Sequence, residues 1–180
     1  SKSPRLLIVD NPTFSFDLED LPLAEKEARI LSRVLPNSTY LTGDEATESR
    51  LREITPYHNI LHLATHGFLS SLGSGRSGMV FAPDQTHNGV WSSAEISQTN
   101  LSHVSLTVLS ACQTSVSPSK TSSLSGITAA FLAAGSQTVI GSLWQVSDES
   151  TAILMINFYE RFLELGYLDA LRSAQAYLRA

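Results

Sequence analysis

Several short runs of this chain are apolar almost throughout, and each has the length of a single β-strand. They occupy residues 5–10, 59–65, 106–110 and 137–143. A strand that is apolar on both sides is buried on both sides, as in a parallel sheet covered by helices. Segments with helical spacing of apolar residues lie between and after these runs, near residues 23–35, 47–54, 124–134 and 147–179. This alternation predicts an α/β fold with a mainly parallel sheet between layers of helices.

Shorter signals complete the expected element order. Residues 39–41 and 79–82 are predicted as strands, and Ser92 or Ser93 is expected to cap a short helix that ends near Gln98. Gly166 is expected to break the last helical stretch into two helices. The Ser- and Gly-rich segments 70–78 and 114–123 are predicted to be flexible loops.

Composition limits the class of protein. The chain has 180 residues and a net charge of −5, and its 12 basic residues form no cluster that could follow a nucleic-acid backbone. No apolar stretch is long enough to cross a bilayer, and no signal peptide is apparent. The single cysteine excludes an internal disulfide and favours a reducing, cytoplasmic location. We therefore expect neither a nucleic-acid partner nor a membrane partner.

The ends of the chain suggest that it is part of a longer protein. It begins with Ser-Lys-Ser rather than Met, and it ends at Ala180 within a helical pattern. Only 16% of the residues are charged, which hints that some surface is covered by a neighbouring domain. We expect residues 1–180 to be one domain of such a protein.

Two of the predicted strands end in residues that can react. His66, followed by Gly67, comes after the strand at 59–65, and Cys112 comes after the strand at 106–110. The carboxyl ends of parallel strands meet at one edge of a sheet, where ligands bind. An imidazole beside a thiol can accept its proton and generate the nucleophilic thiolate. The backbone N–H groups of Gly67 and Cys112 could stabilise a developing oxyanion.

Other interpretations of these residues remain open. A lone cysteine is most often a small buried apolar residue, and a lone histidine is most often structural. A zinc site of His62, His66 and Cys112 is disfavoured, because residues four apart in a strand are about 13 Å apart. His62 is instead interpreted as a packed core histidine, and no metal or cofactor is expected.

The segment after the strand at 137–143 offers a candidate substrate pocket. Asp148 could attract a cationic side chain at the base of that pocket, or could simply cap the helix that starts there. Glu149 competes for either role. Trp144 could wall the same pocket or belong to the core.

Five sequence motifs, and the order in which they occur, resemble the CHAT family, a caspase-like domain often attached to tetratricopeptide repeats. The resemblance covers essentially the whole chain. It is carried by LTGDEAT at 41–47, LHLATHG at 61–67, VLSACQT at 108–114, GITAAFLAAG at 126–135 and SLWQVSD at 142–148.

The resemblance implies a three-layer α/β/α sandwich of the caspase and separase type. It implies that His66 is the general base, that Cys112 is the nucleophile and that the Gly67 N–H lies in the oxyanion hole. Similarity to separases extends to Asp148 as an acid that binds a basic P1 residue. Family members usually continue into a closing segment, which this sequence would then lack.

These observations favour a cysteine endopeptidase that acts on protein substrates. By resemblance, a regulatory partner, expected to be a tetratricopeptide domain in the same polypeptide, would gate its activity. If the pocket prefers basic residues, Arg76 and Lys120 are possible self-cleavage points. One alternative is a non-catalytic caspase-like module that binds a peptide, and a third possibility is a thiol acyltransferase or another small-molecule hydrolase.

Overall fold

The central element of the fold is a parallel sheet. The computed structural model describes residues 3–14, 18, 21–35, 37–69, 77–110, 121–141 and 148–179. The sheet has five strands in the order β2-β1-β3-β7-β8, and every neighbouring pair is parallel. The strands are β1 (Leu6–Pro12), β2 (Thr39–Gly43), β3 (Ile60–Ala64), β7 (Leu106–Leu109) and β8 (Val139–Gly141).

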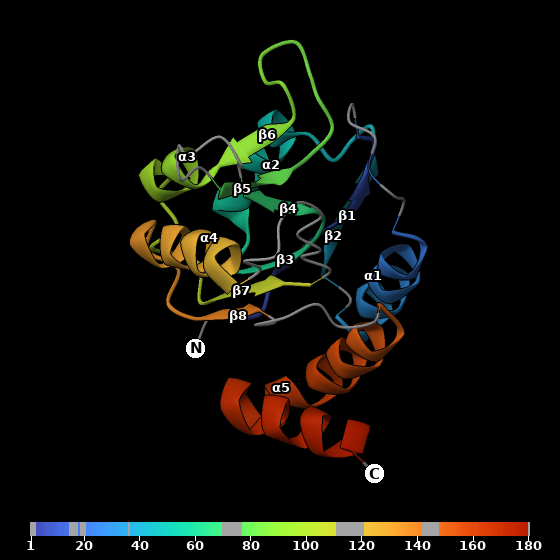
Figure 1. The fold of residues 1–180 in the computed structure, drawn as a ribbon. Coiled ribbons are helices and arrows are strands. Elements are labelled where there is room, and N and C mark those ends of the chain that lie inside the picture. Colours follow the sequence, from blue (N-terminus) through green and yellow to red (C-terminus); the bar gives the residue numbers. More distant parts are fainter. Residues whose placement is uncertain are drawn as a thin grey trace.

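Helices cover both faces of this sheet, which makes the three-layer α/β/α sandwich that the sequence predicts (Figure 1). The helices α1 (Pro22–Val34) and α5 (Asp148–Arg179) lie side by side on one face. The opposite face carries α2 (Glu48–Ile54), α3 (Ser93–Gln98) and α4 (Thr121–Ala133). A 3₁₀ turn, η1 (Thr55–Tyr57), joins α2 to β3.

Alternation along the strands divides the core into two halves. In β1, Leu7 and Val9 face α2 and α4, whereas Leu6 and Ile8 face α1 and α5. Successive side chains of a strand point to opposite faces, so a strand covered on both faces must be apolar at every position. This is why the apolar runs predict the sheet well.

The strand order reverses between β1 and β3. After β1 the chain crosses through α1 to β2, and it then returns through α2 on the other face to β3. The carboxyl ends of β1 and β3 therefore form the topological switch point, the place near which ligands bind in open α/β sheets. The residues that follow these two strands are therefore candidates for a functional site.

A second, smaller sheet lies beyond β3, and the sequence predicted only one of its strands, at 79–82. It is antiparallel, in the order β4-β5-β6, with β4 (Gly67–Leu69), β5 (Ser77–Val80) and β6 (Val90–Ser92). Ser77 and Gly78 belong to β5, so the loop predicted at 70–78 is wrong at these two residues. Ser77 pairs with β4, and Gly78 pairs with both β4 and β6, which the Ser- and Gly-rich composition does not reveal.

Helix boundaries agree with the predicted ones to within a few residues. Ser92 caps α3 through a complete capping box with Glu95. The predicted break at Gly166 is confirmed by its φ of 74° inside α5, a backbone conformation that side chains disfavour. The buried face of α1 is not purely apolar: Ile30 is 38% exposed, whereas Glu27 is buried.

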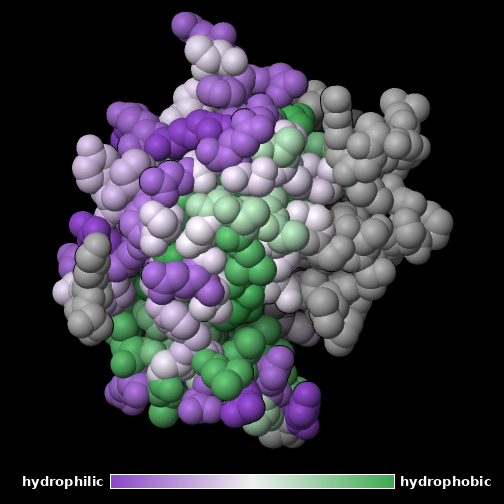
Figure 2. Space-filling model, turned by 90° about the vertical axis from the view of Figure 1, so that its left-hand side faces the viewer, coloured by the Kyte–Doolittle hydropathy of each residue, from purple (hydrophilic) through white to green (hydrophobic). Residues whose placement is uncertain are grey.

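The surface of α5 carries several exposed apolar side chains. Figure 2 shows apolar residues gathered toward the bottom of one face, at the height of α5 in Figure 1. Those of α5 are Leu163, Leu165, Leu168, Tyr177 and Leu178. Such patches are typical of contact surfaces. Among the described helices, none combines the length and the apolar character that a membrane span requires.

Replacing Gly78 with alanine should destabilise the small sheet. A Cβ atom at Gly78 would lie 2.7 Å from the backbone oxygen of Trp91 and 2.8 Å from the Phe68 ring. Overpacking of this kind costs about 1–3 kcal/mol in the free energy of unfolding, measured by urea denaturation. The control Ser77→Ala adds no atom and should cost less. Equal stability of Gly78→Ala and the parent protein would contradict this packing.

Candidate active site

Two aromatic rings lie beside the switch point: that of His66, which follows β3, and that of Phe14, which follows β1. The strand β3 ends at Ala64, and His66 follows two residues later with only 2% of its surface exposed. Phe14 follows β1, and its ring packs edge-on against the His66 imidazole, with ring centroids 4.9 Å apart. Phe14 thus restricts the orientation of His66, and sequence reasoning missed this contact.

The small sheet holds the backbone of the turn that carries His66. The Val80 N–H donates to the His66 carbonyl at 2.9 Å, and the Thr65 hydroxyl donates to the Val80 carbonyl. These bonds attach the turn on both sides of His66 to β5. A histidine held in this way has little freedom to reorient, which suits a base that must keep one geometry.

Gly67 begins β4 and is buried. It pairs with Met79 of β5, and the bond from Val80 to His66 flanks this pair. The pair is therefore a non-hydrogen-bonded one, in which the N–H groups point away from the partner strand. The Gly67 N–H is directed away from β5, an orientation compatible with the predicted oxyanion role.

Cys112 itself lies outside the described residues, but the strand that leads to it is well defined. The strands β3 and β7 are adjacent and parallel, and Leu63 is the register partner of Leu109. His66 and Cys112 each follow this pair by three residues along the chain. The Ser110 N–H donates to the Leu63 carbonyl at 3.0 Å, which extends the pairing by one bond toward Cys112.

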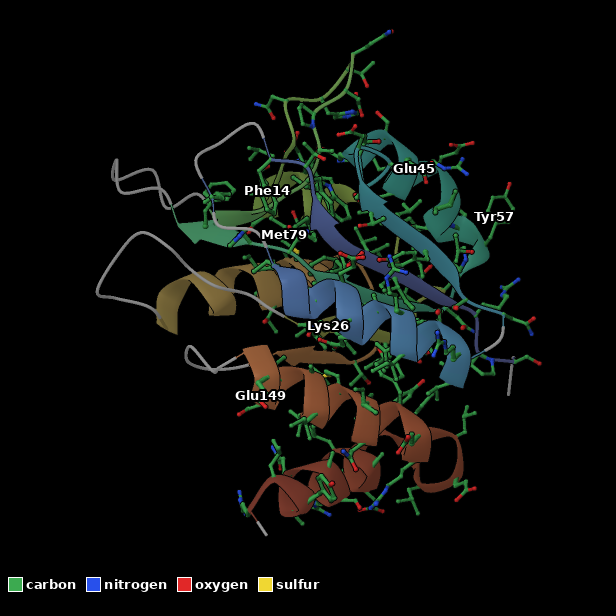
Figure 3. The ribbon with its side chains drawn as sticks, turned by 90° about the vertical axis from the view of Figure 1, so that its right-hand side faces the viewer. Phe14, Lys26, Glu45, Tyr57, Met79 and Glu149 are labelled. Carbon is green, nitrogen blue, oxygen red and sulfur yellow. The ribbon has the colours of Figure 1, made fainter. Side chains whose placement is uncertain are left out.

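The candidate substrate pocket lies largely outside the described part of the structure. Trp144 and the side chain of Asp148 belong to the undescribed part, as do Arg76 and Lys120. The helix α5 begins at Asp148, close to the predicted helix start. Figure 3 places Phe14 and the exposed Glu149 toward the same side of the molecule, with Tyr57 at the opposite side.

A buried carboxylate lies close to the switch point. Asp10 is completely buried near the carboxyl end of β1, between its register partners Thr42 of β2 and Ala64 of β3. Burial raises the pKa of Asp10 to about 6, and the nearby hydroxyls of Tyr40 and Thr42 oppose the shift only partly. Burial, together with the Asp10 charge, raises the pKa of Tyr40 in turn.

His62 is completely buried among residues of α1 and α5, in agreement with its interpretation as a core histidine. Within the described ranges, no group of three or more His, Cys, Asp and Glu side chains is placed to hold a metal ion. The disfavoured zinc site of His62, His66 and Cys112 includes a residue, Cys112, that lies outside the described ranges.

The five-stranded, parallel sheet with helices on both faces is consistent with a caspase-like sandwich. The family model of the CHAT domain matches residues 1–180, and the chain therefore belongs to the CHAT domain family. CHAT domains have a caspase-like fold, and many are cysteine peptidases. A comparison with curated protein sequences gave no significant match.

The stability of the protein should depend on the ionisation of Asp10. Because the folded protein raises this pKa from 3.8 to about 6, Asp10 contributes stability at low pH that is lost as pH rises through about 6. The amide in Asp10→Asn stays neutral. The free energy of unfolding of Asp10→Asn, relative to that of the parent protein, should therefore rise by on the order of 2–3 kcal/mol between about pH 4 and pH 8.

Urea denaturation at several pH values measures this difference. Asp169→Asn is the matched control, because it makes the same exchange at an exposed position of α5. A constant difference between Asp10→Asn and the parent protein would contradict the raised pKa.

Removing the Phe14 ring should loosen His66. An edge-on aromatic pair is worth about 0.5–1.5 kcal/mol beyond the area it buries, so Phe14→Ala should let the imidazole sample further orientations. The His66 ring signals in an NMR spectrum should then shift and broaden. Tyr57→Ala, at an exposed position on the opposite side, should leave them unchanged. Unaltered His66 signals in Phe14→Ala would contradict an orienting role.

Proposed function

We propose that this CHAT domain is a cysteine endopeptidase with His66 as general base and Cys112 as nucleophile. The observation that carries the proposal is the register of β3 and β7, from which both residues follow at the same distance along the chain. The burial of His66 at the switch point and the family of the chain add to it.

In this mechanism, His66 accepts the proton of the Cys112 thiol. The thiolate attacks the carbonyl carbon of the scissile peptide bond, and the Gly67 N–H stabilises the oxyanion that forms. Collapse of this intermediate breaks the C–N bond, and the leaving amine takes the proton from His66. His66 then deprotonates a water molecule, which attacks the thioester, releases the new carboxyl group and restores the thiol.

We further propose that the substrate pocket prefers a basic P1 residue, with Asp148 as its acid and Trp144 as a wall. A carboxylate in a partly desolvated pocket favours a cationic side chain over a neutral one. In the whole protein, a regulatory domain, such as one of tetratricopeptide repeats, would gate the activity. The exposed apolar side chains of α5 support such a contact. A reducing compartment such as the cytoplasm would keep Cys112 as a thiol.

The test is cleavage of a fluorogenic peptide library that varies the P1 position. The parent protein should cleave peptides with basic P1 residues. Cys112→Ala and His66→Ala should each lose turnover by at least about a thousandfold, as expected when a member of a catalytic unit is removed. Asp148→Ala should lose the preference for basic residues while retaining turnover.

Glu149→Ala is the matched control for Asp148, because it removes the neighbouring acid from the same helix. Equal turnover by Cys112→Ala and the parent would contradict a cysteine peptidase. Binding of library peptides without cleavage, in the whole protein with its partner present, would instead favour the peptide-binding module.

A further inference from the structure

A polar cluster is buried between the sheet and the α1 layer, separate from the His66 turn. We call it the Glu27 cluster, and it consists of Glu27, His62, Ser110 and Tyr159. The Ser110 hydroxyl lies 3.1 Å from each carboxylate oxygen of Glu27. The His62 Nε2 atom lies 3.0 Å from Glu27 Oε1, and His62 Nδ1 lies 3.2 Å from the Tyr159 hydroxyl oxygen.

The members of this cluster come from separate elements. Glu27 lies on α1, His62 on β3, Ser110 directly after β7, and Tyr159 on α5. Each is almost inaccessible to solvent, with Glu27 only 2% exposed. One carboxylate therefore contacts both central strands from the same side of the sheet.

Stability alone is a poor explanation for this arrangement. Burying a carboxylate is costly, and apolar residues of similar volume often stabilise a core as well as a buried ion pair does. Most of the other buried side chains of this layer are apolar, such as Met155, Phe158 and Phe162. Hydrogen bonds to a charged group do offer directional contacts that fix one geometry.

The position of the cluster indicates what it fixes. Ser110 is the last described residue before Cys112, which follows two residues later. His62 lies on β3, four residues before His66. The hydrogen bond from Ser110 to Glu27, together with the close contact between Glu27 and His62, resists movement of one strand end relative to the other.

We infer that Glu27 is a positioning residue that holds the carboxyl ends of β3 and β7 in the relative placement that the candidate dyad requires. This inference rests on the proposed function. Glu27 acts through Ser110 and His62 and has no contact with substrate. Loss of its charge should disturb the environment of the Cys112 thiol more than it disturbs the fold.

The experiment measures alkylation of Cys112 by iodoacetamide in the full chain, as a function of pH. Cys112 is the only cysteine, so the rate reports on one thiol. Glu27→Gln keeps the shape of the side chain and removes its charge. At mildly acidic pH its alkylation should be slower than that of the parent by about tenfold to a hundredfold.

Two further variants make the comparison specific. Glu25→Gln removes an acid from the same helix at an exposed position and should stay within about twofold of the parent. Ser110→Ala removes the hydroxyl that Glu27 contacts without a change of charge. This variant tests the same contact if Glu27→Gln does not fold. Its effect combined with that of Glu27→Gln should be less than additive if both act through one contact.

The outcomes separate the two proposals when His66→Ala is measured in parallel. Slower alkylation in His66→Ala, Glu27→Gln and Ser110→Ala at full folding supports the positioning role. Slower alkylation in His66→Ala alone, with Glu27→Gln reduced only in thermal stability, overturns the positioning role and leaves the dyad intact. An unchanged rate in His66→Ala overturns the dyad, and the positioning role with it.

Discussion

The structure depends most on the parallel pairing of β3 with β7 at the centre of the sheet. Both strands are completely buried, so a shift of one residue in their register would move polar groups such as His62 to the wrong face. The pairing of Leu63 with Leu109 therefore decides where the polypeptide leaves the sheet after β3 and after β7. The neighbouring strands and both helical layers are arranged around this pair.

Several of the buried polar groups lie in the layer between the sheet and α1. Asp10, His62 and Ser110 all lie on the α1 side of their strands, and Glu27 meets two of them from the helix. The opposite core, beneath α2 and α4, is formed by apolar residues that include Phe81, Trp91 and Phe131. Buried charge also occurs on the opposite face, where Glu48 of α2 is 1% exposed and forms an ion pair with Arg52. The layer behind the candidate site differs in that its carboxylate Glu27 contacts both central strands.

Much of the fold could be predicted because burial on both faces leaves a clear pattern. Apolar runs identify the central strands, and the Ser92 capping box and Gly166 mark helix ends by local chemistry. Apart from the strand at 79–82, the small sheet was not predicted, because strands of three or four residues show no usable period. The burial of Glu27 was not predicted, although Glu27 lies three residues after Ala24 and four before Leu31, on the buried stripe of the helix. Contacts between distant segments, such as that of Phe14 with His66, leave no local signal in one sequence.

The order of the strands also bears on how the chain folds. The first strand meets β3 across a long stretch of sequence, and the Arg5 N–H donates to the Asn59 side chain 54 residues away. Contacts of this range form slowly, because the intervening chain must lose its entropy before they contribute. The small sheet is local, yet the turn that it holds continues directly from β3. The environment of His66 is consequently complete only after the non-local strands have paired, so a partly folded chain lacks it.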